Sequence, residues 1–154
     1  MREKLWLFIA KFLGVSLILF VLWFWKGEFV YFQIFWQLAG SFYKAFGINV
    51  VILPLIVPLF TNLLPFLSLM IITRGISLKE RLSKSGYGVL IIFGWQIFLS
   101  WAMYEMQGKT QTPSSFALKG SLVIYMLNYA LPFLLWMLFA REQLRRLFIL
   151  KPGK

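Results

Sequence analysis

The sequence predicts an all-α integral membrane protein that forms a single membrane domain over residues 1–154. Four transmembrane helices arranged as two hairpins, and one interfacial amphipathic helix after the first span, make up the expected fold. Hydrophobic residues are 60% of the chain and charged residues only 14%, whereas soluble domains carry roughly 45–50% apolar and about 25% charged residues. A domain of this size still exposes about a third of the surface of its unfolded chain, so this much apolar surface requires lipid as its solvent.

Several classes of chemistry are excluded by residue type. The chain has no Cys, no His and no Asp, which removes disulfides, thiol and imidazole catalysis, and ordinary zinc, haem or iron–sulfur sites. A net charge of +11 would indicate nucleic-acid binding in a soluble protein, but beside apolar spans such charge sets membrane orientation. We therefore expect no enzyme, no metal, no cofactor and no nucleic acid.

Residues 5–25 form the first predicted span, which as a helix is about 31 Å long and crosses a bilayer core. Trp23, Phe24 and Trp25 end it, not the small residues of a signal-peptide cleavage site, so we expect a retained span. Lys11 lies inside this span. It can snorkel to the cytoplasmic headgroups, or pair with an acidic group of another subunit.

Residues 29–46 are predicted to be the interfacial helix. Gln33, Gln37, Ser41 and Lys44 are spaced by four, four and three residues, which gives one narrow polar stripe on a helix. The remaining face is rich in aromatic residues, as expected of a helix lying in the membrane interface. A fifth, tilted span and a re-entrant segment are the alternatives, and a fifth span would reverse the orientation of all that follows.

Residues 50–73 form the second predicted span, about 36 Å long as a straight helix. It contains Pro54, Pro58 and Pro65, and each proline removes a helix hydrogen bond. In lipid the freed carbonyl groups need other partners. We therefore expect this span to be bent, or broken near its outer end.

The third and fourth predicted spans are residues 87–104 and 121–140, about 27 and 30 Å long as helices. Gln96 and Ser100 lie four residues apart on one face of the third span, and the fourth span carries Asn128. A polar loop joins the two spans, and a basic tail with one apolar side follows the fourth.

The distribution of Lys and Arg predicts the orientation of the spans. With the N-terminus inside, eleven of these residues fall on the cytoplasmic side and four on the outer side. Because cytoplasmic segments are enriched in Lys and Arg, both termini are expected in the cytoplasm. Two basic clusters should attract anionic lipid headgroups there, or an acidic cytoplasmic partner. These clusters consist of Arg74, Lys79, Arg81, Lys84, Arg141, Arg145 and Arg146.

One string of residues occurs twice, at Asn62–Arg74 and Asn128–Arg141. From Leu64 and Leu131 the two copies align without a gap over eleven positions, and they share Leu, Pro, Phe, Leu, Met and Arg at the same offsets. We interpret this as a Pro-kinked helix used twice. The predicted orientation makes the two copies parallel, as in folds with repeats about an axis along the membrane normal. Chance similarity between leucine-rich helices is the alternative.

Asn62, Asn128 and the prolines Pro65 and Pro132 are the candidate site. In the functional interpretation they form a polar spot near mid-membrane that contacts a partner helix or a small ligand. In the structural interpretation, which we favour, each Asn satisfies carbonyl groups freed by the following proline.

Glu28 and Glu105 are the only acidic residues expected on the outer side, and they lie beside Lys26 and Lys109. Two carboxylates can perform acid–base chemistry. The adjacent lysines favour solvated interfacial pairs instead. The sequence therefore provides no set of catalytic residues.

Residues 62–95, NLLPFLSLMIITRGISLKERLSKSGYGVLIIFGW, resemble the small membrane proteins associated with exosortase H in bacteria. The shared features are an Asn-x-x-Pro-Phe entering an apolar run, a short basic connection and a Gly-containing span. The resemblance implies an accessory of a protein-sorting transpeptidase in the bacterial inner membrane. The transpeptidases themselves resemble one another in a Cys, Arg and His set, and this chain has neither Cys nor His.

These observations predict a non-enzymatic accessory or structural subunit of a bacterial inner-membrane complex. It would bind partner helices within the bilayer, with other membrane proteins and anionic lipids as its partners. The alternative is a small transporter or channel whose path is lined by Asn62 and Asn128.

Overall fold

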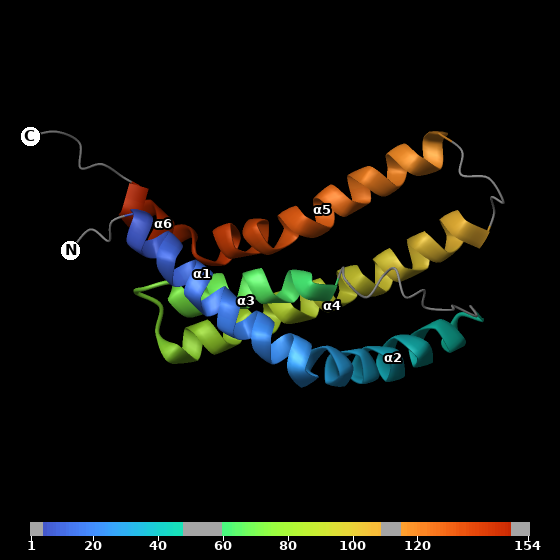
Figure 1. The fold of residues 1–154 in the computed structure, drawn as a ribbon, viewed down its shortest axis with the longest axis horizontal. Coiled ribbons are helices and arrows are strands. Elements are labelled where there is room, and N and C mark those ends of the chain that lie inside the picture. Colours follow the sequence, from blue (N-terminus) through green and yellow to red (C-terminus); the bar gives the residue numbers. More distant parts are fainter. Residues whose placement is uncertain (1–4, 48–59, 109–114, 149–154) are drawn as a thin grey trace, which may run out of the picture.

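The computed structural model describes residues 5–47, 60–108 and 115–148, and every regular element in these ranges is a helix (Figure 1). This confirms the predicted all-α class. The elements are α1 (Leu5–Leu22), the π-helical turn η1 (Trp23–Gly27), α2 (Glu28–Ala45), α3 (Leu63–Ile72), α4 (Leu78–Gly108), α5 (Ser115–Phe139) and α6 (Arg141–Phe148).

Among the described residues, three helices are long and apolar enough to cross a membrane, namely Trp6–Ala45, Leu78–Ala102 and Leu122–Phe139. The latter two overlap the predicted third and fourth spans. Of the predicted second span, residues 50–59 with Pro54 and Pro58 lie outside the described residues. Its remainder is the shorter apolar helix Phe60–Ile72.

The predicted first span and interfacial helix are continuous. Instead of a break after Trp25, the structure has the wide turn η1, in which the backbone N–H of Glu28 donates to the Trp23 carbonyl. Gly27 keeps helical angles, φ −61° and ψ −42°, so it does not end the helix. The resulting 40-residue run is about 60 Å long, roughly twice a bilayer core. It therefore cannot cross a bilayer upright as one straight helix.

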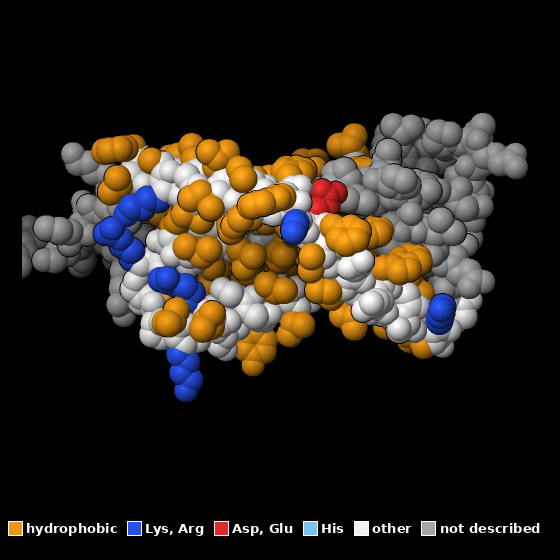
Figure 2. Space-filling view, turned by 60° about the horizontal axis from the view of Figure 1, so that its bottom comes forward, with side chains coloured by type: hydrophobic (Ala, Val, Ile, Leu, Met, Phe, Trp, Pro, Cys, Tyr) orange, Lys and Arg blue, Asp and Glu red, His pale blue; other side chains and the backbone are white. Residues whose placement is uncertain are grey.

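The helices run alternately along the molecule (Figure 1). α1 and α2 run in one direction, α3 returns, α4 runs forward again and α5 returns. The start of α1, the connection between α3 and α4, and α6 lie at one end of the molecule. Figure 2 shows Lys and Arg side chains gathered at this end, and we call it the basic end.

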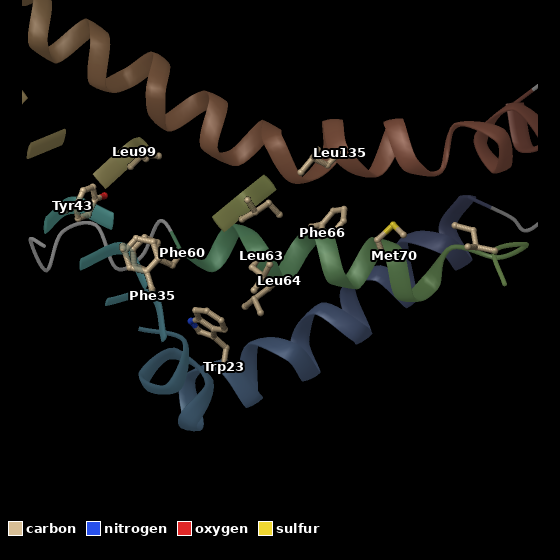
Figure 3. Packing of buried hydrophobic residues seen from close by; sticks show 13 residues of the cluster. Trp23, Phe35, Tyr43, Phe60, Leu63, Leu64, Phe66, Met70, Leu99 and Leu135 are labelled. Carbon is tan, nitrogen blue, oxygen red and sulfur yellow. The ribbon is translucent and has the colours of Figure 1, made fainter. Parts of the chain in front are cut away.

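α3 is the central helix, with α1 on one side and α5 on another (Figure 3). Phe66 and Met70 on α3 are fully buried. Their counterparts in the second copy of the repeated string, Phe133 and Met137 on α5, are 43% and 45% exposed. The two copies run in the same direction but occupy different environments, one central and one peripheral.

The two prolines of the repeated string also differ. Pro65 is the third residue of α3, after a 3₁₀ turn at residues 60–62, where a backbone N–H would have no helical partner in any case. Pro132 lies inside α5, where it removes an internal hydrogen bond. In the described residues, the first copy therefore has its proline in the first turn of a helix, whereas the second copy has its proline in a helix interior.

α2 packs on α4 through its aromatic face. Phe35 lies with its ring centroid 4.6 Å from that of Phe60 and 5.4 Å from that of Phe93. The Tyr43 hydroxyl donates to the Ile97 carbonyl at 2.7 Å. The polar stripe predicted for this segment is exposed. The aromatic face thus meets protein, while the position of α2 relative to a membrane stays a prediction.

α3 and α4 approach closely at Gly88. A Cβ atom at this position would lie 2.0 Å from Cζ of the buried Phe66 ring. The turn between the two helices contains Gly75 with φ +80°, a left-handed conformation that glycine adopts at no steric cost. Glycine at these two positions lets the α3–α4 hairpin close.

Hydrophobic side chains cover much of the outer surface (Figure 2). They include Trp25, Trp6 and Leu13, which are 76%, 64% and 60% exposed. Single exposed apolar residues are ordinary in soluble proteins, but extensive apolar surface marks contact with a membrane or another protein. The surface is compatible with a membrane protein.

Candidate functional site: a buried polar network

The two asparagines predicted as a polar spot meet inside the bundle. Asn62 lies at the start of α3 and Asn128 lies in the middle of α5. Asn62 Nδ2 donates to Asn128 Oδ1 at 2.8 Å. The two side chains are 2% and 0% exposed, so the pair is enclosed by the protein itself.

Three further side chains extend this pair into what we call the polar network, namely Tyr31, Gln96 and Trp95 with Asn62 and Asn128. Gln96 Nε2 donates to Asn62 Oδ1 at 2.8 Å, and the Tyr31 hydroxyl donates to Gln96 Oε1. Trp95 Nε1 donates to Asn128 Oδ1 at 3.0 Å. The hydrogen bonds therefore connect α2, the start of α3, α4 and α5.

The polar network follows a consistent order of donors and acceptors. Tyr31 donates to Gln96, Gln96 to Asn62 and Asn62 to Asn128, whose oxygen also accepts from Trp95. Polar groups removed from water are costly unless they are hydrogen-bonded. Satisfied networks of this kind specify one arrangement of the helices around them.

Asn62 does not have the role that we favoured from the sequence. It is the N-cap of α3, but its side chain makes no capping hydrogen bond. Its side chain hydrogen-bonds to the side chains of Asn128 and Gln96, not to backbone carbonyl groups. The physical reason is that Pro65 lies in the first turn of α3, so it interrupts no hydrogen bond within that helix.

Sequence reasoning missed three members of the polar network. Gln96 was recognised only as part of a polar face of the third span, and Tyr31 and Trp95 only as aromatic residues. A buried amide in a membrane span requires a partner, so Gln96 with Asn62 and Asn128 formed a detectable set. The sequence held no comparable signal for Tyr31 or Trp95, since tyrosine and tryptophan are also common at lipid interfaces.

Two of the predicted lipid-binding cations cap other helices. Arg81 Nη2 donates to the Thr73 carbonyl at the end of α3, at 2.8 Å. Lys84 Nζ donates to the Phe139 carbonyl at the end of α5, at 2.8 Å, and forms an ion pair with Glu80 at 2.7 Å. A cation at a helix C-terminus satisfies a carbonyl group without a helical partner and interacts favourably with the helix dipole.

The other basic residues lie on the surface of the basic end. Arg74, Lys79, Arg141 and Arg145 are exposed, and the side chain of Arg146 lies outside the described part of the chain. Inside this end, Trp136 Nε1 donates to Thr73 Oγ1 at 2.8 Å. The exposed cations therefore lie around a hydrogen-bonded junction of α3, α4 and α5.

The described residues include no group of three His, Cys, Asp or Glu side chains that could hold a metal ion. Glu28 lies at the surface junction of α1 and α2, and the side chain of Glu105, with Lys109, lies outside the description. No family model matches the chain, and neither a curated protein nor a solved structure matches it. The functional argument therefore depends on the residues and their geometry.

Proposed function

We propose that this chain is a non-enzymatic accessory or structural subunit of a bacterial inner-membrane complex, and that it holds partner helices within the bilayer. It would cross the membrane four times along the long axis of the bundle, as two hairpins with α1 and α2 together in the first crossing and both termini in the cytoplasm. The observation that carries the proposal is the polar network. Its amide groups bond to one another inside the chain, while the outer surface is largely apolar.

The polar network supports a structural role better than a transport path. A path for ions or polar solutes needs polar groups in contact with water. Asn62 and Asn128 are 2% and 0% exposed and bond to each other. At about 0.6 kcal/mol for a hydrogen bond in a membrane protein, the four bonds of the network contribute roughly 2–3 kcal/mol to helix association.

The apolar outer surface and the basic end supply the contacts for partners. In lipid, helices associate through packing and hydrogen bonds, because the hydrophobic effect does not drive them together there. The exposed Arg74, Lys79, Arg141 and Arg145 would bind anionic headgroups or an acidic segment of a partner at the cytoplasmic face. The resemblance of residues 62–95 to exosortase H-associated proteins suggests that the partner is a protein-sorting transpeptidase.

Gentle detergent extraction of the chain from its native membrane, followed by mass measurement of the intact particle, tests this proposal. We expect a particle that contains a different membrane polypeptide. A particle that always contains this chain and lipid only would rule the accessory role out. Replacing Asn62 and Asn128 together by Leu tests the transport alternative. If these groups line a path, solute flux should differ between the wild type and the double variant. If their role is structural, neither the wild type nor the double variant should carry such a flux.

A further inference from the structure

The junction of α1 and α2 carries a basic and an acidic residue on an apolar surface. Lys26 is exposed and Glu28 is half-buried. Both line a surface hollow of about 300 Å³ whose other walls are Phe24, Trp25, Phe29 and Phe32. Figure 2 shows red and blue side chains close together among hydrophobic ones near the middle of the long axis.

The packing of α1 and α2 places this junction at the middle of the bundle. Trp23 points inward from it (Figure 3), with its ring centroid 5.3 Å from that of Tyr31. The Tyr31 ring lies 6.4 Å from that of Phe93, near the centre of α4. If the helices cross a bilayer along the long axis of the bundle, as the proposed function holds, Lys26 and Glu28 lie at the depth of the hydrocarbon core.

Charged groups at such a depth pair with one another or face protein. Among the described residues, neither Lys26 nor Glu28 forms an ion pair. The sequence placed both at the outer end of the first span, where water would solvate them. The structure instead has a continuous helix through the junction, so at this depth each charge needs an opposite charge that the described residues do not supply.

We propose that a second copy of this chain is that partner, with Lys26 of each copy paired with Glu28 of the other. A two-fold axis along the membrane normal leaves the depth of every residue unchanged. In two copies related in this way, Lys26 of each copy lies at nearly the same depth as Glu28 of the other. The same ion pair therefore forms twice. The aromatic walls of the two hollows then pack together around the two ion pairs.

A lipid headgroup has complementary charges if it is zwitterionic, but it belongs at the membrane interface. The hollow lies beside the middle of the apolar helices, so a second copy suits it better. This inference rests on the proposed membrane location. It is independent of which other polypeptide the subunit serves.

Fluorescence energy transfer between donor- and acceptor-labelled chains in phosphatidylcholine vesicles tests the inference. The chain has no Cys, so Ser83→Cys on exposed α4 surface gives one labelling site. We expect transfer between wild-type chains. Lys26→Glu or Glu28→Lys alone should weaken self-association by roughly tenfold or more, because each puts like charges opposite one another. The matched control Lys44→Glu, an exposed residue in the last turn of α2, should leave transfer unchanged.

The decisive mixture combines donor-labelled Lys26→Glu with acceptor-labelled Glu28→Lys. Transfer should return in this mixture and in the double variant Lys26→Glu/Glu28→Lys, which separates loss of pairing from misfolding. Monomeric wild-type chains, or no recovery in the mixture, would overturn the inference. A monomeric wild type that retains more phosphatidylethanolamine than Lys26→Glu would also contradict it and assign the hollow to a headgroup. Each of these results leaves the extraction test of the accessory role unaffected.

Discussion

Asn128 is the residue on which most of the polar network depends. Its Oδ1 atom accepts hydrogen bonds from Asn62 Nδ2 at 2.8 Å and from Trp95 Nε1 at 3.0 Å. One fully buried oxygen therefore connects α5 to both α3 and α4. This is a larger structural role than compensation for Pro132, the role that the sequence favoured.

Replacing Asn128 by Leu should destabilise the fold by roughly 2 kcal/mol, since it leaves the buried Asn62 amide and the partly buried Trp95 N–H without an acceptor. Unfolding in a denaturing detergent titration measures this change. Tyr129→Leu is the control, because the neighbouring Tyr129 is 56% exposed. Equal stability of the two variants would show that the hydrogen bonds to Asn128 contribute little.

Gly88 tests the packing of α3 on α4. In Gly88→Ala the added Cβ would meet the fully buried Phe66 ring at 2.0 Å, so we expect a loss of about 1–3 kcal/mol from overpacking. Gly94→Ala on the same helix has nothing within 4 Å and should be neutral or slightly stabilising, since alanine favours helix. Thermal unfolding in detergent compares them, and a Gly88→Ala variant as stable as Gly94→Ala would contradict the close approach.

At the scale of elements, α4 also caps two other helices. Side chains from its first turns bond to carbonyl groups at the C-termini of α3 and α5. Arg81 reaches the last turn of α3 and Lys84 the last turn of α5. These contacts fix where α3 and α5 stop at the basic end. The sequence indicated only that these residues were basic and on the cytoplasmic side.

Lys84→Gln should destabilise the protein by about 0.5–1 kcal/mol, because α5 loses a cationic cap at its C-terminus. Lys79→Gln is the matched control, since Lys79 is exposed on the same helix. Hydrogen exchange at the end of α5 gives a local readout, and faster exchange is expected only in Lys84→Gln. Unchanged hydrogen exchange at the end of α5 would contradict the capping role of Lys84.

The helical class and most of the helices over residues 87–104 and 121–140 could be predicted from the sequence, because long apolar runs favour helices, whose backbone hydrogen bonds are internal. The junction of α1 and α2 could not be predicted from the sequence. Gly27 and the charges beside it indicate a break, but in the structure they lie in a π-helical turn with helical angles. Likewise, an aromatic face has the same composition whether it meets lipid or, as in α2, another helix.

The candidate site was predictable in part. Asn62 and Asn128 attract attention because amides are rare in apolar runs, and they do meet. Their equivalence in the repeated string did not predict their surroundings. α3 is central and α5 peripheral, and long-range packing, which local similarity does not encode, determines that difference.

At the scale of the whole molecule, most of the exposed cations gather at one end of the long axis. Lys and Arg side chains cluster at the basic end in Figure 2, while the rest of the described surface is largely apolar apart from Lys26, Glu28 and the polar stripe of α2. Such a distribution suits a chain that is embedded in lipid and anchored at one face. Under the proposed function, the basic end is the surface where anionic headgroups or a cytoplasmic partner would meet the protein.

The triple variant Arg74→Gln/Arg141→Gln/Arg145→Gln should retain less anionic lipid, because each basic residue near the surface contributes about 1 kcal/mol to that attraction. Mass spectrometry of the protein extracted from vesicles that contain phosphatidylglycerol measures the bound lipid. Lys44→Gln, on the exposed stripe of α2, is the control. Equal retention by the triple variant and the control would exclude the basic end as a lipid-binding surface.

The central claim is that the buried amides hold the helices of this chain together. A double-mutant cycle on Asn62→Leu and Asn128→Leu, with unfolding free energies measured in one detergent, tests it most directly. We predict a coupling energy of about 0.6–1.7 kcal/mol, the range of hydrogen bonds within membrane proteins. Strictly additive effects of the two substitutions would contradict the claim, because they would mean that the Asn62–Asn128 hydrogen bond does not stabilise the fold.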